Sequence, residues 1–238
     1  MNFQPLLLGH RGVRPLRRFR LPHPDSLPRE NTIAAFEYAL AHGCDGFEFD
    51  VRTTRDGRNI LWHDPKLHGL EISSASFDEL RARSEVEPAC LEDALLLFAD
   101  RAYFDIEVKA PGDEEAIVAA VRSHPPNRGY VVSSFLGPVL RRLHAIDASL
   151  PLGYICDRTE DLSLWRELPI RVLIPQYKLV SQNLISDVHD RGLQLFTWTV
   201  NRKPDLVRLA DWGIDAVISD DPALLSRTFR ARSRSNSE

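Results

Sequence analysis

The amino-acid sequence predicts an α/β fold, a single (β/α)₈ TIM barrel with one extra hairpin strand after its second strand. Apolar runs typical of buried strands alternate with amphipathic runs typical of helices, which favours a parallel sheet covered by helices. Eight of these runs can form parallel strands, and 238 residues is an ordinary length for one such barrel. No change in composition marks a second domain, so residues 1–226 are expected to form one barrel domain.

The first predicted strand is PLLLGH at residues 5–10. A helix is expected at 32–42, where Asn31 or Thr32 can serve as the N-cap because each side chain can accept a hydrogen bond from the first helical turn. The second strand is GFEFDV at 46–51.

The segment after the second strand decides the strand count. Only RTTRDGR separates Val51 from the next apolar run, and Asp56-Gly57 within it is a strong turn signal. A parallel crossover needs about a dozen residues or more. The run NILWHD at 59–64 is therefore predicted to return as a hairpin strand and not as the next strand of the barrel.

The rest of the chain supplies six more strands and four helices. The strands are expected at 103–109, 130–135, 151–156, 171–175, 193–200 and 215–220. The helices are expected at 114–123, 138–146, 179–191 and 203–212. Segments 13–29 and 65–76 are expected to be irregular. Residues 227–238 alternate Arg and Ser with little apolar content, which predicts a disordered tail.

Composition indicates which binding partners and which cellular compartment to expect for the protein. A net charge of -4 argues against a nucleic-acid partner held by bulk charge. The cysteines Cys44, Cys90 and Cys156 are odd in number and widely spaced, which is typical of reduced thiols and predicts a cytoplasmic protein. No stretch approaches the roughly 18 apolar residues of a membrane helix, so stable membrane insertion is not expected. Nothing in the sequence indicates an oligomeric state.

Polar residues gather where the predicted strands end. His10 closes the first strand, Glu48 and Asp50 share one face of the second, and Glu107 and Lys109 share one face of the third, because side chains two apart on a strand point the same way. Later strands end in further polar or aromatic groups, namely Ser133, Ser134, Trp198, Asn201, Ser219 and Asp220. Active sites of α/β barrels lie at the C-terminal ends of the strands, so one pocket should collect these groups.

The residue types in this set predict cation-assisted acid–base chemistry. A carboxylate inside an apolar strand is costly unless it is paired or bound to a cation. Glu48, Asp50 and Glu107 would supply three hard oxygen donors on adjacent strands, which suits Mg²⁺ or Ca²⁺. His10 and His63 are natural proton donors and acceptors near neutral pH. Each residue alone would more often be structural, but their convergence on one rim favours a functional site.

Eight segments in order resemble the signatures of the glycerophosphodiester phosphodiesterase family, from about Leu8 to Leu225. They are LGHRG, RENTIAAF, GFEFDVRTTRDG, ILWHDP, FDIEVK, SSF, FTWTVN and GIDAVISDDPALL. The resemblance implies a hydrolase of lipid and glycerol metabolism that converts a small-molecule glycerophosphodiester to glycerol 3-phosphate and an alcohol.

The resemblance also implies a role for each matching residue. His10 and His63 would be the catalytic acid–base pair, and Glu48, Asp50 and Glu107 would hold one divalent cation, Mg²⁺ or Ca²⁺, with Mn²⁺ as a third option. Arg11 and Lys109 would contact the phosphate and Trp198 would line the substrate pocket. Glu30, Asn31 and Asp64 would orient neighbouring side chains. His63 is favoured as acid and His10 as base; direct attack by water and a cyclic phosphate intermediate both stay open.

The chain departs from the family pattern near the expected pocket. Arg29 stands where the family usually has Pro before the ENT motif, and the preceding segment is long and rich in arginine. Its role as a solvated insertion, a phosphate-recruiting lid or a contact for an anionic surface stays open. The segment after His63 and Asp64 is shorter than in the family, which would open one side of the pocket. Two other functions therefore stay under consideration: lysophospholipase D activity on the same site, and a non-catalytic binding barrel.

Overall fold

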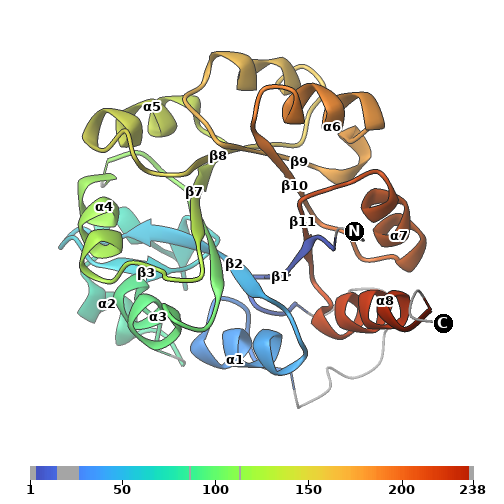
Figure 1. The fold of residues 1–238 in the computed structure, drawn as a ribbon. Helices are drawn as coiled ribbons and strands as arrows, with labels where there is room; N and C mark the ends of the chain where they lie inside the picture. The colour runs from blue at the N-terminus through green and yellow to red at the C-terminus, as the bar shows by residue number, and fades with distance from the viewer. Residues whose placement is uncertain (1–3, 15–26, 86, 113, 236–238) are drawn as a thin grey trace.

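A closed ring of eight parallel strands surrounded by helices is seen in the computed structural model, which describes residues 4–14, 27–85, 87–112 and 114–235 (Figure 1). Around the ring the strands are β1 (Leu6–His10), β2 (Gly46–Thr53), β6 (Tyr103–Val108), β7 (Tyr130–Ser134), β8 (Leu152–Cys156), β9 (Val172–Pro175), β10 (Gln194–Thr197) and β11 (Ala216–Ser219). Pairing of β1 with both β2 and β11 closes it. The predicted (β/α)₈ barrel is confirmed.

The predicted hairpin strand is also confirmed. Strand β3 (Asn59–Leu61) runs antiparallel to the end of β2, with Val51 opposite Leu61. Gly57 forms the turn with a positive φ of 79°, and its N–H donates to the carbonyl of Thr54. Because β2 extends past its ring neighbours, its last residues are free to pair with β3 outside the barrel.

The segment that follows β3 is more ordered than the sequence suggested. It contains a two-stranded ribbon of β4 (Lys66–Leu67) and β5 (Leu70–Glu71), then η1 (Ile72–Ser74) and α2 (Phe77–Arg81). Its apolar side chains pack together as a small separate core, which includes Ile60, Leu67, Ile72, Phe77 and Leu80. This local core explains the order.

Helices cover the outside of the ring (Figure 1). They are α1 (Ile33–Ala41), α3 (Leu91–Phe98), α4 (Glu114–Ser123), α5 (Gly137–Ile146), α6 (Gln182–His189), α7 (Lys203–Asp211) and α8 (Pro222–Ser235), with the short turns η2 (Leu162–Glu167) and η3 (Tyr177–Leu179). Of the two candidate N-caps of α1, Thr32 is the one that accepts from the backbone, at Ala35. Helix α3 was not predicted, although Leu91, Leu95 and Phe98 follow helical spacing and are fully buried.

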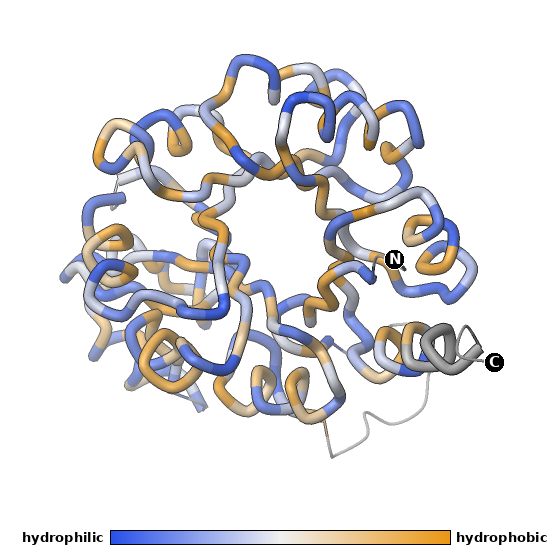
Figure 2. The backbone as a smooth tube through the Cα atoms, viewed as in Figure 1, coloured by the Kyte–Doolittle hydropathy of each residue, from blue (hydrophilic) through white to orange (hydrophobic). Residues whose placement is uncertain are grey.

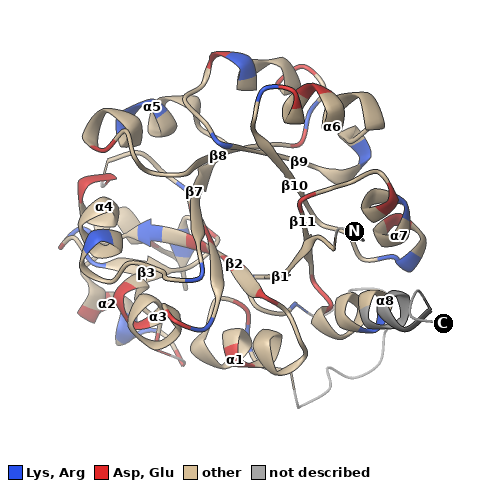
Figure 3. Cartoon of the chain, viewed as in Figure 1, with Lys and Arg blue, Asp and Glu red and all other residues tan. Residues whose placement is uncertain are grey.

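The core has two layers because strand residues alternate between inside and outside. Outward residues pack under the helices, where the rings of Phe36 and Phe47 stack at 4.1 Å. Inward apolar residues such as Leu8, Phe196 and Ile218 fill the barrel interior. Orange, apolar stretches occur on the ring of strands and on the surrounding helices in Figure 2. Charged residues lie mainly on helices and loops, so the acidic stretch within β2 stands out in Figure 3.

Residues 227–235, predicted to belong to a disordered tail, lie in α8, which continues to Ser235. Thr228 and Phe229 are only 2% and 3% exposed. Leu225 and Phe229 are four residues apart, so both lie on the face of α8 that joins the main core. The proposed domain boundary at 226 falls inside this helix, and residues 236–238 lie outside the described part.

The structure can be compared with the expectations for the arginine-rich segment, for membrane-spanning helices and for the cysteines. Most of the arginine-rich segment, residues 15–26, lies outside the described residues. Within the described chain, every helix is too short or too polar to cross a bilayer. The three cysteines, predicted to be reduced thiols, are free in the structure, and all three are buried.

Candidate active site

His10 is held at the end of β1 by a carboxylate from the last strand. Its Nδ1 lies 2.7 Å from Oδ1 of Asp220, which follows β11, the ring neighbour of β1. The amide of Asn201 donates to the other oxygen of Asp220 at 2.6 Å. Burial tends to raise the pKa of Asp220, but hydrogen bonds from His10 and Asn201 lower it below its ordinary value. The ring of His10 is therefore fixed, with Nε2 3.8 Å from Oε2 of Glu48.

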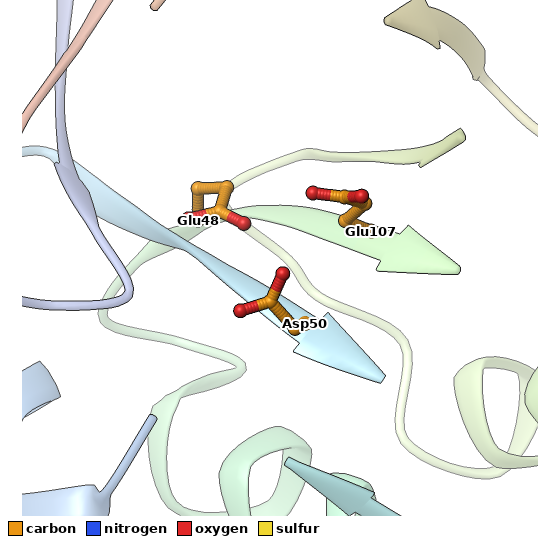
Figure 4. Close-up of side chains that lie close together, drawn as sticks. All are labelled: Glu48, Asp50 and Glu107. Atoms are coloured by element: carbon orange, nitrogen blue, oxygen red, sulfur yellow. The ribbon is translucent and has the colours of Figure 1, made fainter. Parts of the chain in front are cut away.

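Three buried carboxylates converge beside His10. Glu48 and Asp50 come from β2 and Glu107 from β6, where Asp50 and Glu107 are direct partners in the strand register (Figure 4). One oxygen from each lies within 4.8 Å of the others. The two-residue spacing read from the sequence brings them together because alternate residues of both strands face the barrel interior.

Two cationic side chains flank the carboxylates. Lys109 Nζ lies 2.6 Å from Glu107 Oε1 and 3.2 Å from Asp50 Oδ1. Arg11 Nε lies 3.0 Å from Asp50 Oδ2, and Arg11 Nη1 donates to Glu30 at 2.8 Å. Glu30 also accepts from Arg14, so it orients Arg11 from behind.

The backbone conformation at Arg11 and Asn31 allows both residues to hydrogen-bond to the clustered carboxylates. Both residues have positive φ, 52° and 56°. In this conformation the Arg11 N–H donates to Glu48 Oε2 at 2.9 Å, and the Asn31 side chain both donates to Asp50 Oδ2 and accepts from the Asp50 N–H. Glu30 and Asn31, the two ENT residues, therefore hydrogen-bond directly to Arg11 and Asp50.

The electrostatic environment differs among the three carboxylates. Burial, with the nearby Asp50 charge, raises the pKa of Glu48 well above its ordinary value and raises the pKa of Glu107 to about 7. Burial also tends to raise the pKa of Asp50, but Lys109 and Arg11 lower it below its ordinary value. When all three carboxylates are ionised, Lys109 and Arg11 do not fully neutralise them.

These residues fit a hard divalent cation. Oε1 of Glu48 and Oδ1 of Asp50 are buried and accept no hydrogen bond from the described residues. Buried oxygens of this kind are costly unless something binds them. Two of the three clustered carboxylates thus have an oxygen without a hydrogen bond, and carboxylate oxygens are the ligands that Mg²⁺ and Ca²⁺ prefer.

His63 reaches the site from the hairpin, two residues past the end of β3. Its carbonyl accepts from Arg52 Nε at 2.8 Å and its Nδ1 lies 2.7 Å from Asp64 Oδ1. Burial lowers the pKa of His63, and the positive charge of Arg11 lowers it further. The side chain is 39% exposed, so His63 lies on the solvent side of the site.

A cavity of about 100 Å³ unites these groups at the C-terminal end of the barrel. Its lining includes both catalytic candidates, both cationic side chains, two of the three clustered carboxylates and three inward isoleucines: His10, Arg11, Glu48, His63, Glu107, Lys109, Ile155, Ile174 and Ile218. Trp198 also lines it and is held by its Nε1–H, which donates to the carbonyl of Ile174. Glu30, Asn31, Asp50 and Asp64 are not among the residues that line this cavity.

Sequence reasoning gave no role to two lining residues, Asp105 and Phe135. Asp105 is two residues before Glu107, so the spacing that identified Glu107 also placed Asp105 on the inner face. Phe135 meets Trp198 edge to face at 5.5 Å. Asp220 was placed at the rim from the sequence, but its contact with His10 was not foreseen.

A family model described as the glycerophosphoryl diester phosphodiesterase family matches residues 10–224. Among curated proteins, the chain is 29% identical to a glycerophosphodiester phosphodiesterase of Caldanaerobacter subterraneus subsp. tengcongensis, over 84% of this chain and 92% of that protein. It is 23% identical to human lysophospholipase D GDPD3, over 82% of this chain and 76% of that protein.

Solved structures share the fold. An Oleispira antarctica phosphodiesterase in complex with the product sn-glycerol-3-phosphate superposes with a TM-score of 0.80 at 20% identity, covering 95% of this chain and 97% of that one. A glycerophosphodiester phosphodiesterase from Thermotoga maritima gives a TM-score of 0.77 at 24% identity, covering 95% and 99%.

Proposed function

The chain belongs to the glycerophosphoryl diester phosphodiesterase family, and on that premise we propose that it hydrolyses glycerophosphodiesters to glycerol 3-phosphate and an alcohol. The observation that carries the proposal is the single cavity that holds two histidines together with acidic and cationic side chains. A barrel that had lost catalysis would be expected to lack one of these groups, and all are present.

The cationic side chains bind the phosphate in this proposal. Arg11 and Lys109 are each tied to Asp50, so they present their remaining N–H groups in fixed positions at the cavity wall. A divalent cation held by Glu48, Asp50 and Glu107, with Mg²⁺, Ca²⁺ and Mn²⁺ as candidates, would neutralise charge that develops on the phosphate oxygens. Trp198 lines the cavity wall where the substrate binds.

The two histidines move the protons. In the tautomer whose Nδ1–H donates to Asp220, Nε2 can take a proton from the attacking hydroxyl or water. His63 then protonates the leaving alkoxide. Because burial and Arg11 lower the pKa of His63 in the free protein, the negative charge of the bound phosphodiester is what favours its protonated form.

A coupled assay for glycerol 3-phosphate, run on a panel of glycerophosphodiesters with Mg²⁺, Ca²⁺ and Mn²⁺ varied, tests the proposal. We expect release that depends on an added cation and stops in excess chelator. Full activity in chelator would contradict the cation requirement. Full activity in the double variant His10→Ala/His63→Ala would contradict the acid–base pair.

A groove beside the cavity favours a second candidate substrate, a lysophospholipid. The groove measures about 430 Å³ and shares Phe135 and Ile155 with the cavity, so the two spaces adjoin. Its apolar lining includes Pro138, Leu164 and Leu168, and Leu164 is 43% exposed. An acyl chain on the glycerol could therefore leave the cavity past Phe135 and lie against apolar side chains.

Rates on lysophosphatidylcholine and glycerophosphocholine separate the two substrates. If the groove holds an acyl chain, Leu164→Glu should raise KM for lysophosphatidylcholine and leave glycerophosphocholine hydrolysis unchanged. Leu97→Glu, on the exposed outer side of α3, is the matched control. Equal effects of both variants on lysophosphatidylcholine would exclude the groove as the acyl site.

A further inference from the structure

Four inward carboxylates, not three, form a block on β2 and β6. The parallel register pairs Glu48 with Asp105 and Asp50 with Glu107, so the residues lie in two layers, one above the other along the barrel axis. Asp105 is fully buried in the deeper layer and lines the same cavity as Glu48 and Glu107. It is not one of the three residues whose oxygens converge within 4.8 Å.

The two layers are neutralised unequally. In the outer layer, Lys109 contacts both Asp50 and Glu107. In the deeper layer, Asp105 accepts a hydrogen bond from the Ser133 hydroxyl at 2.5 Å, and no cationic side chain of the described residues forms an ion pair with it. Removing a carboxylate from water without a cation beside it is costly.

Unsatisfied oxygens also occur in the deeper layer. Oε1 of Glu48 and Oδ2 of Asp105 are buried and have no hydrogen-bond partner among the described residues. The free oxygen of Glu48 belongs to a residue of the convergent cluster, and Asp105 is its neighbour across the register. A fully buried oxygen of this kind beside a cation site points to a partner that arrives with the cation.

We propose that Asp105 is a positioning residue for the cation centre, whose free Oδ2 accepts a hydrogen bond from a water molecule held by the cation. The inference rests on the proposed cation-dependent function and adds a residue to it. The charges agree: with all four carboxylates ionised, Arg11 and Lys109 leave an excess of two negative charges, which one divalent cation would neutralise. The Ser133 hydroxyl occupies Oδ1, so Oδ2 is the oxygen of Asp105 left for this water molecule.

Isothermal titration of the purified full-length protein with MgCl₂, CaCl₂ or MnCl₂ tests this role. Asp105→Asn keeps the shape of the side chain and removes its charge, and we expect its cation Kd to rise about tenfold or more. Ser133→Ala is the matched control, because it removes the hydrogen bond to Asp105 but keeps the carboxylate. It should keep a Kd within about threefold of the parent value.

Thermal unfolding gives a second readout that does not depend on activity. In excess chelator the Asp105→Asn protein should melt at the parent temperature or above it, because an uncompensated buried charge has been removed. On addition of MnCl₂ its melting temperature should rise less than that of the parent. Asp105→Ser, smaller and also neutral, repeats both measurements should the Asn variant fail to fold.

The outcomes distinguish this inference from the function on which it rests. An unchanged cation Kd in Asp105→Asn, with normal binding by the parent, would overturn the role of Asp105 alone. A parent protein that binds none of the three cations would overturn the cation centre itself. Equal weakening in Asp105→Asn and Ser133→Ala would show that Asp105 acts only as a structural partner of Ser133, and would also overturn the proposal.

Discussion

The Nδ1 atom of His10 lies 2.7 Å from Oδ1 of Asp220, although 210 positions separate the two residues in the chain. Ring closure brings them together, because β1 and β11 are adjacent strands. A carboxylate at Nδ1 selects the tautomer in which Nε2 is free to accept a proton, and it stabilises the imidazolium that forms. The role that we propose for His10 on the first strand thus depends on a residue that follows the last strand.

Asp220→Asn should therefore lower kcat by about 10²-fold or more with little change in KM, since the amide can donate to Nδ1 and hold the wrong tautomer. The glycerol 3-phosphate assay measures this effect. Asp157→Asn, an exposed carboxylate just after β8, makes the same chemical change at the same end of the barrel and should be close to parent activity on glycerophosphocholine. Similar losses in both variants would contradict an orienting role for Asp220.

His63 should take up a proton when a phosphate ligand binds. Burial and the Arg11 charge lower its pKa in the free protein, so it is neutral at pH 7, and an anionic ligand beside it should raise the pKa. NMR titration of the His63 ring with and without glycerol 3-phosphate measures the change. By linkage, ligand affinity should fall as pH rises through the raised pKa. The ring signals of His144, on the outside of α5, should not respond to the ligand, and a silent His63 would refute the prediction.

Cation binding should stabilise the protein more at pH 8 than at pH 6. Burial raises the pKa of Glu107 to about 7 from an ordinary value of 4.5. Without a cation, the contribution of Glu107 to the stability of the folded protein is therefore fully present at pH values below its ordinary pKa. This contribution is lost as pH rises through about 7, where Glu107 ionises in the folded protein. A cation compensates the charge that remains, so the gain in Tm on adding MgCl₂ or MnCl₂ should grow between pH 6 and pH 8. A gain that shrinks over this range would contradict the assignment of Glu107 as a ligand.

Glu48→Gln should separate activity from stability. The amide can still accept from the Arg11 N–H, so the loop should keep its shape. We expect loss of glycerol 3-phosphate release by at least about 10²-fold, while the Tm in chelator stays equal or rises because a buried charge is removed. Circular dichroism during heating provides the Tm. A large drop in Tm would show instead that Glu48 is needed for folding.

Phe229→Ala should destabilise the protein by about 3–5 kcal/mol, because the ring on α8 is almost fully buried in the main core. Urea unfolding measures the free energy. The neighbouring Arg227→Ala is the control, since Arg227 is exposed and should change the free energy of unfolding by less than about 0.5 kcal/mol. Equal stability of the two variants would contradict the packing of α8 against the barrel.

Much of the site was predictable from short-range patterns. The inward placement of Glu48, Asp50 and Glu107 follows from the two-residue period of strands, and the hairpin that carries His63 follows from the Asp56-Gly57 turn. Such features depend on neighbours within a few residues. They can therefore be predicted from the sequence, and they are the same in the folded structure.

The remaining features depend on residues that meet only after the ring has closed. The sequence indicated a free tail after 226, but Phe229 finds a buried site among core residues from other elements. It also placed Asp105 and Asp220 on the correct strands without showing the contact of Asp220 with His10 or the free oxygen of Asp105. The sequence by itself thus determined the strands, their inner faces and the residues that meet at the rim. Only the tertiary structure decided which carboxylates are paired and which are free, because burial and charge compensation depend on distances across the closed barrel.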